Sequence, residues 1–200
     1  MSATVLYMSM SVDGFVTGPN ERPDNGLGDG GLRLHRWCLP DEDPVNLSAA
    51  SQRLTGVDRE VWEQMLTTGA VVTGRQTFEM AGGWSGDHHD GVPIWVVTRH
   101  EPHPEYSAPE IVTYTGDVHD AVRRAKEAAG ERDVMVHGAG LAPVLLGAGL
   151  LDEIQVHVVP VLFGEGRRLF DGPMSGHPEL ELISARPGEG ALHVRYRVRR

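Results

Sequence analysis

Short apolar runs alternate with polar, glycine-containing segments along most of the chain. Six runs are rich in β-branched and aromatic residues and predict strands; they cover residues 3–11, 70–73, 92–98, 111–114, 133–136 and 153–162. Helical patterns follow several of these runs, over residues 58–68, from 74 onward, and over 117–129 and 139–150. Strands that alternate with helices in this way are typical of a parallel sheet with helical crossovers.

Two aspartates are predicted to cap helices at their N-termini. Asp58 precedes a run with apolar residues on one face, and Asp117 precedes a second run that Gly130 ends. Shorter helices are expected near residues 32–37 and after Asn46. These helices would cover the faces of the sheet.

The C-terminal part of the chain has a different pattern. Residues 180–186 and 191–198 form two strand-like runs that Pro187–Gly190 joins, which predicts an antiparallel hairpin. No internal repeat or long linker divides the sequence. The expected fold is therefore one α/β domain over residues 1–200, with a mixed, mostly parallel sheet and a C-terminal antiparallel hairpin.

Composition narrows the classes of protein. Hydrophobic residues make up 40% of the 200 positions and charged residues 23%, which is enough for one buried core. The net charge of −10 argues against nonspecific binding to nucleic acid or an anionic membrane. The single cysteine, Cys38, excludes an intramolecular disulfide and favours a reducing cytoplasm. Neither a secretory signal nor an apolar run long enough to span a membrane is recognisable.

Three predicted strand ends carry residues suited to phosphate. Gly74–Thr77 combines a glycine, a helix start, an arginine and a threonine, Thr98-Arg99 follows the next strand, and His137–Leu141 places glycines before a helix. Each segment alone is also compatible with a plain turn, a solvated arginine or close helix packing. Because parallel strands end at one edge, the three together predict a nucleotide site, and two arginines favour NADPH over NADH.

The order of the motifs resembles the dihydrofolate-reductase-like superfamily. The motifs are MSMSVDGFVTG, VVTGRQTF, PIWVVTR, VHGAG and GLLDEIQVHVVPVLFGEGRRLF. The last is most similar to the C-terminal reductase domain of the bifunctional riboflavin-biosynthesis deaminase-reductase. The resemblance extends from Thr4 to about Arg197, and it implies a three-layer fold, NADPH, hydride transfer and a homodimer.

The resemblance also implies roles for single residues. Ser9, Val16 and Asp13 would border the nicotinamide, and Asp13 is the candidate catalytic group, as a proton relay or substrate anchor; a plain turn residue is the alternative. The candidate cofactor-binding residues beyond these are Gly74, Arg75 and Thr77 for phosphate, Thr98 and Arg99 for the 2′-phosphate end, and Gly138, Ala139, Gly140 and Leu141 for the pyrophosphate.

Departures from the superfamily bear on the substrate. Asn25–Gly31 lacks the context of the helix acid that binds pterin in dihydrofolate reductases, and the zinc-binding residues of the fused deaminase have no counterpart. The expected function is NADPH-dependent reduction of a small heterocyclic or ribosylamino-pyrimidine substrate, as in 5-amino-6-(5-phosphoribosylamino)uracil reductase. The alternatives are dihydrofolate reduction and a catalytically silent nucleotide-binding module.

Several other polar residues have two interpretations. His137 replaces part of a glycine pair found in many relatives, and it could face the substrate or reshape the pocket. Arg167-Arg168 could bind a substrate phosphate or remain solvated. No metal site is expected, because the spacing of the remaining candidates, His88, His89, His100, His103 and His119, does not place three on one face.

Overall fold

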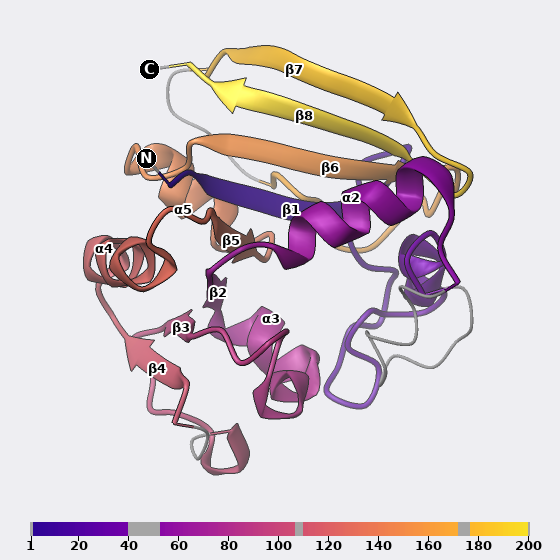
Figure 1. Cartoon of the computed structure of the whole chain (residues 1–200). Coiled ribbons are helices and arrows are strands. Elements are labelled where there is room, and N and C mark those ends of the chain that lie inside the picture. Colours follow the sequence, from indigo (N-terminus) through magenta and orange to yellow (C-terminus); the bar gives the residue numbers. More distant parts are fainter. Residues whose placement is uncertain (1, 40–52, 107–109, 172–176, 200) are drawn as a thin grey trace.

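One eight-stranded sheet forms the centre of the molecule. The structure is a computed structural model that describes residues 2–39, 53–106, 110–171 and 177–199. The strands are β1 (Thr4–Ser11), β2 (Ala70–Gly74), β3 (Ile94–Val97), β4 (Val112–Thr115), β5 (Val134–His137), β6 (Glu153–Val159), β7 (Leu180–Pro187) and β8 (Leu192–Val198). They lie in the order β4-β3-β2-β5-β1-β6-β8-β7, so β7 and β4 are the two edges (Figure 1).

The strand pairing confirms the predicted mixed sheet. β1 to β6 run parallel to their neighbours, whereas β8 is antiparallel to both β6 and β7. All eight predicted strands are present, some of them shorter than expected. The β7–β8 pair is the C-terminal hairpin, and a register shift between Leu182 and Ser184 interrupts it.

Helices cover both faces of the sheet. They are η1 (Gly31–His35), α2 (Gly56–Leu66), α3 (Arg75–Met80), η2 (Gly82–Gly86), η3 (Pro104–Tyr106), α4 (Val118–Ala129) and α5 (Ala142–Gly147). Residues that alternate along β1 belong to different cores: Leu6 packs with α4 and α5, whereas Val5 and Tyr7 pack with η1, α2 and α3. This two-sided burial explains why the central strands are continuous apolar runs.

The helix boundaries correct two predictions. Asp58 is not an N-cap: Thr55 precedes α2, and Asp58 lies in the first turn with its carboxylate bonded to other elements. The helix predicted over 139–150 is shorter, because Gly138–Leu141 forms a turn and α5 begins only at Ala142. The helix expected after Asn46 lies outside the described residues.

The prediction for α4 is confirmed. Asp117 accepts hydrogen bonds from the backbone N–H groups of His119 and Asp120, and Gly130 ends the helix with a φ of 62°. The short helix expected near residue 32 is the 3₁₀ helix η1. Within the described ranges, none of the helices has the length and apolar character needed to cross a membrane.

Candidate active site

The three predicted phosphate-binding segments share the carboxyl edge of the sheet. The register pairs Thr73 with His137 and Gly74 with Val97, so β2, β3 and β5 end side by side. Arg75, Thr98 and Gly138 are the residues that follow these ends. The structure therefore brings the three segments together, as the motif order predicts.

Two of these segments pack directly against each other. Gly138 has a φ of 108°, and a Cβ at this position would lie 2.5 Å from the Thr77 hydroxyl oxygen. A Cβ at Gly74 would in turn contact the side chain of Leu141. A residue larger than glycine at position 138 would displace Thr77, so glycine there allows the two segments to pack together.

The two arginines lie at this edge with different partners. Arg75 forms an ion pair with Glu79 one turn along α3, at 3.3 Å. Arg99 is exposed, and the adjacent Thr98 hydroxyl accepts a hydrogen bond from the backbone of His100. Neither arginine is buried, so both guanidinium groups are accessible to a ligand phosphate.

The residues predicted to border the nicotinamide lie at the end of β1 and just beyond it. Ser9 is buried and its hydroxyl accepts a hydrogen bond from the Trp37 indole at 2.8 Å. Val16 is buried in the core on the α4 side. The backbone N–H of Val16 donates to the carbonyl of Arg167, and this bond joins the turn after β1 to the loop after β6.

Asp13 has the contacts of a structural residue. Its carboxylate accepts hydrogen bonds from the Ser11 hydroxyl at 2.6 Å and from the backbone N–H groups of Phe163 and Gly164. The Ser11 bond lowers the pKa of Asp13 to about 2, so the group carries no proton near neutral pH. These contacts agree with the turn interpretation, while a role as substrate anchor stays a prediction.

The remaining sequence candidates are engaged in other ways. Arg167 pairs with Glu21 at 3.0 Å, and Arg168 lies over the Phe15 ring, 4.3 Å from its centroid. Burial raises the pKa of the Cys38 thiol, as expected for an inert buried cysteine. Within the described ranges, no group of three or more His, Cys, Asp or Glu side chains is arranged to hold a metal ion.

Two clusters of histidines lie on the α2 side of the sheet, and all of their rings except that of the half-buried His137 are buried. In the first, His137 contacts the Tyr7 carbonyl at 2.8 Å and His88 at 3.0 Å, and His88 contacts His89 at 2.7 Å. Burial lowers the pKa of His137 to about 4 and holds that of His88 well below its usual value. These histidines are neutral at pH 7 and form a hydrogen-bonded chain beneath the carboxyl edge.

The second cluster contains Asp58, His193 and His157. The His193 ring is 2.7 Å from the Asp58 carboxylate through Nε2 and 2.7 Å from His157 through Nδ1. Both rings are only 2% exposed. The sequence analysis did not identify this cluster, because its members are up to 135 residues apart; knowing the β6–β8 register, which pairs His157 with His193, would have revealed it.

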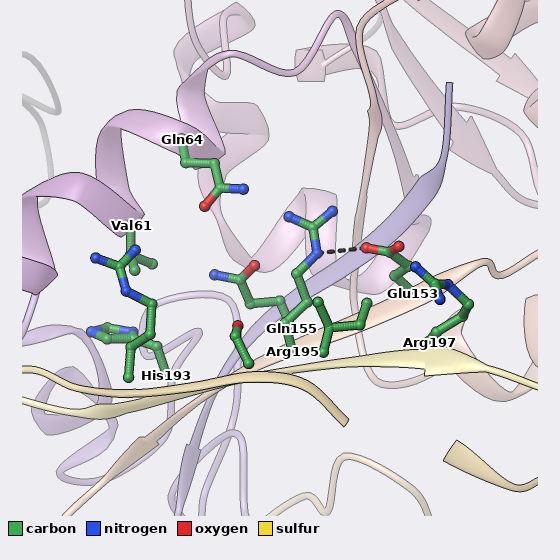
Figure 2. A pocket seen from close by; sticks show the side chains of 10 residues that line it. Val61, Gln64, Glu153, Gln155, His193, Arg195 and Arg197 are labelled. Carbon is green, nitrogen blue, oxygen red and sulfur yellow. Dashed lines mark hydrogen bonds and ion pairs between the residues drawn. The ribbon is translucent and has the colours of Figure 1, made fainter. Parts of the chain in front are cut away.

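A pocket of about 260 Å³ opens beside this second cluster. Helix α2 contributes Val61 and Gln64, and the strands contribute Gln155, His193 and Arg195, among others. Figure 2 shows the polar ends of Gln64, Gln155 and Arg195 directed toward the space between the helix and the strands, with Arg195 held by Glu153. Of the two histidines in this cluster, His193 lines the pocket.

Comparison with known proteins identifies the family. The model of the RibD C-terminal domain matches residues 3–194, and the chain therefore belongs to the RibD C-terminal domain family. A Shewanella sp. PV-4 protein assigned to riboflavin biosynthesis has a similar structure, with a TM-score of 0.70 at 18% identity over 99% of both chains.

Two further structures extend the likeness. Enterococcus faecalis dihydrofolate reductase, solved with NADP(H), has a TM-score of 0.57 at 14% identity over 99% of this chain and 97% of its own. The Thermotoga maritima diaminohydroxyphosphoribosylaminopyrimidine deaminase/5-amino-6-(5-phosphoribosylamino)uracil reductase has a TM-score of 0.58 at 12% identity, over 98% of this chain and 56% of its own. At these identities the structures establish the fold, which is dihydrofolate-reductase-like.

Proposed function

We propose that this protein is an NADPH-dependent reductase that transfers a hydride to a small heterocyclic or ribosylamino-pyrimidine substrate. The observation that carries the proposal is the close packing of Gly74–Thr77 against Gly138–Leu141 at the carboxyl edge of the sheet. Membership of the RibD C-terminal domain family supports the same reaction class. When bound, NADPH would supply the hydride, and the protein's own residues would bind and orient the reactants.

The residues at the edge fit a dinucleotide. Nothing lies within 4 Å of a Cβ built at Gly140, so the backbone there is open, which suits a pyrophosphate that must approach the main chain closely. Arg75 and Arg99 offer guanidinium groups for the 2′-phosphate, and Ser9 would lie beside the nicotinamide. Asp13 would hold the turn after β1 in place, because its carboxylate bonds to the Phe163–Gly164 backbone.

Cofactor choice tests the proposal. Each charge-assisted contact to the 2′-phosphate is worth ~1.5–3 kcal/mol, or roughly ten- to a hundredfold in affinity. Replacing Arg75 or Arg99 by alanine should weaken NADPH binding by that factor and leave NADH binding nearly unchanged. The dissociation constants of both cofactors are measured for the wild type, both variants and Arg123→Ala, an exposed arginine of α4. Equal affinity of the wild type for NADH and NADPH would contradict the assignment of these arginines.

An acceptor assay separates the alternative functions. NADPH oxidation is followed with 5-amino-6-(5-phosphoribosylamino)uracil and, separately, with dihydrofolate. Turnover of the first supports the proposed reductase, and methotrexate-sensitive turnover of the second alone would replace it with dihydrofolate reduction. Tight NADPH binding without turnover of any acceptor would identify a silent nucleotide-binding module.

We also propose a homodimer. The edge strand β7 exposes Leu180, Leu182 and Ile183, with 40–57% of each residue accessible. Exposed apolar groups on an unpaired edge favour association with another chain. Light scattering at micromolar concentration should give twice the 21.8 kDa chain mass; a monomeric mass would contradict the proposal.

A further inference from the structure

The pocket beside helix α2 lies away from the carboxyl edge of the sheet. Its floor is formed by β6 and β8, where the register pairs Gln155 with Arg195 on one side and with Tyr7, in the first half of β1, on the other. Helix α2 forms the opposite wall with Val61 and Gln64 (Figure 2). The candidate cofactor segments follow β2, β3 and β5, and β5 and β1 separate β2 from β6. The pocket is therefore distinct from the proposed cofactor site.

The side chain of Gln155 is buried at this pocket without a partner for its oxygen. The residue is 3% exposed, and its Oε1 atom has no hydrogen-bond partner within the part of the chain that the structure describes. Figure 2 shows the amide directed toward the space between Gln64 and the Arg195 guanidinium. An unpaired buried oxygen lowers stability, because it has lost water and gained no donor. A ligand donor in the pocket would satisfy it after a turn about the last side-chain bond, a torsion with broad preferences.

The lining carries an excess of positive charge. Its charged members among the described residues are Arg186, Arg195, Arg197 and Glu153. Glu153 is already engaged, since its Oε2 lies 2.5 Å from Arg195 Nε. His193 also lines the pocket and is neutral at pH 7, because burial lowers its pKa. Three arginines and one glutamate give this lining a formal charge of +2, although the whole chain carries −10.

Two of these arginines are available to a ligand. Arg186 pairs with Glu60 of α2, and Arg197 lies 3.7 Å from Glu181, so their acidic partners lie outside the pocket lining. Both acids are largely exposed, and ion pairs with such groups contribute little to stability, because water screens them. A guanidinium group has five N–H donors, so each arginine can keep its acid and still bind an anion.

Uncharged polar groups complete the lining. Gln64 lines the pocket from α2 and Ser184 from β7, and both side chains can donate or accept hydrogen bonds. Apolar contacts come from Val61 and Ile183. The volume of about 260 Å³ is below the ~300–1,000 Å³ of sites for drug-sized ligands. The pocket therefore suits a small ligand with several polar groups.

We propose that this pocket is a binding site for a small organic anion that also carries hydroxyl groups, namely the phosphate monoester of a short polyol. Arg186 and Arg197 bind the phosphate, whose charge near −2 matches two guanidinium groups. A hydroxyl of the ligand donates to Gln155 Oε1 and fills the vacant acceptor. The residues of this site differ from the candidate cofactor residues, so the inference stands independently of the reductase function.

NMR of the full-length protein, with glycerol 3-phosphate as the probe, tests the site. The signals followed are the side-chain amide of Gln155 and the Nε–H of Arg186, assigned by their loss in Gln155→Leu and Arg186→Gln. Both should shift along one saturable curve. Glycerol, which lacks the phosphate, and inorganic phosphate, which lacks the polyol, should each bind at least about tenfold more weakly. No shift with glycerol 3-phosphate, or equal affinity for inorganic phosphate, would overturn the proposal.

Variants test the two contacts separately. Gln155→Leu and Arg186→Gln should each weaken glycerol 3-phosphate binding about tenfold, measured by calorimetry. The control is Arg123→Gln, an exposed arginine of α4 that also pairs with acids, and its affinity should stay within about twofold of the wild type. Wild-type affinity in both Gln155→Leu and Arg186→Gln would overturn the site.

Thermal melts show whether each variant is folded. Gln155→Leu should melt no lower than the wild type, because it replaces an unpaired buried polar group by an apolar one of similar size. Arg186→Gln changes a surface ion pair and should also remain folded. The arginine variant therefore decides the outcome even where the buried substitution disturbs the fold. Glycerol 3-phosphate should raise the melting temperature of the wild type, since it binds the folded chain only.

The candidate cofactor site is the competing location for a phosphate ester. The titration is therefore repeated with NADPH present and with the Arg75→Ala variant. Affinity for glycerol 3-phosphate should be unchanged within about twofold in both cases. Competition by NADPH, or loss of binding in Arg75→Ala, would place the probe at the carboxyl edge and overturn the second site. Failure of the reductase assay would leave this result unaffected, because the titration measures binding and not turnover.

Discussion

Helices cover both faces of the sheet, but the side chains buried on the two faces differ in polarity. On the face with α4 and α5, the buried side chains are almost all alanine, valine and leucine. On the face with η1 and α2, every buried aspartate or histidine of the described residues is found: Asp58, His88, His89, His157 and His193. His157 and His193 belong to strands β6 and β8, Asp58 to α2, and His88 and His89 to the segment before β3, so strands, helix and loop all contribute to the difference.

The ionisable groups on the polar face require compensating interactions that the apolar face does not. A buried ionisable group lowers stability unless it is hydrogen-bonded, and the apolar face shows that this fold needs none for its own packing. The histidines on the polar face are neutral and bonded to one another or to Asp58. Ionisable groups with strongly shifted pKa values are common at functional sites, and structural networks also contain them.

The free energy of unfolding should depend strongly on pH because of the histidines on the polar face. Burial lowers the pKa of both His35 and His137 to about 4, whereas the unfolded chain titrates near 6.5. Below pH 6.5 the unfolded state binds protons that the folded state does not, so stability is complete above 6.5 and falls as the pH decreases toward 4. At pH 5 each of these two histidines should lower the free energy of unfolding by about 2 kcal/mol relative to pH 8, and the two together should lower it by about 4 kcal/mol. Urea unfolding at pH 8 and pH 5 measures the loss.

The variant His35→Gln is the control for this prediction. It removes one of the titrating groups, so its free energy of unfolding should decrease between pH 8 and pH 5 by about 2 kcal/mol less than that of the wild type. Asp13 does not contribute over this interval, because its pKa of about 2 keeps it ionised at both values. A wild type equally stable at pH 8 and pH 5 would contradict the neutral, buried state of the histidines.

A substitution on the apolar face should lower the free energy of unfolding by somewhat less than acidification to pH 5 does. This loss should not depend on pH. Leu145 of α5 is fully buried between the helix and the sheet. Leu145→Ala removes buried carbon atoms and leaves a cavity, which should cost about 3 kcal/mol. The same loss is expected at pH 8 and pH 5 in urea unfolding. A loss that changed by more than about 1 kcal/mol between the two values would show that the faces are energetically coupled.

The fold could be predicted from the sequence because its signals are local. Six apolar runs correspond to β1–β6, the two strand-like runs at the C-terminal end correspond to β7 and β8, and Asp117 and Gly130 mark the ends of α4. The errors came from tertiary contacts. Asp58 has the sequence context of a helix cap, but its carboxylate accepts hydrogen bonds from Gly190 and His193, which belong to the C-terminal hairpin.

The candidate site could be predicted only in part, for the same reason. Gly74 ends β2 and Gly138 directly follows β5, so their shared edge could be predicted from the sequence, and the structure brings the two segments together. The Asp58–His193–His157 cluster depends on the β6–β8 register and on the position of α2. No local pattern contains that information, and His157 and His193 read as ordinary strand residues.

The smallest expected effect comes from the aspartate that does cap a helix. Asp117 accepts from the N–H groups of His119 at 2.8 Å and Asp120 at 3.2 Å, both near the surface. Asp117→Ala should therefore cost about 1 kcal/mol, equally at pH 8 and at pH 5, while Asp117→Asn should retain most of the stability. Urea unfolding measures this, and His193 serves as a reporter on the other face: its NMR titration should be unchanged in Asp117→Ala and shifted in Asp58→Asn. Asp117 belongs to α4 and its side-chain hydrogen bonds are to His119 and Asp120, away from the Asp58–His193–His157 cluster. A shift of the His193 titration in both variants would therefore mean that the two faces do not act independently.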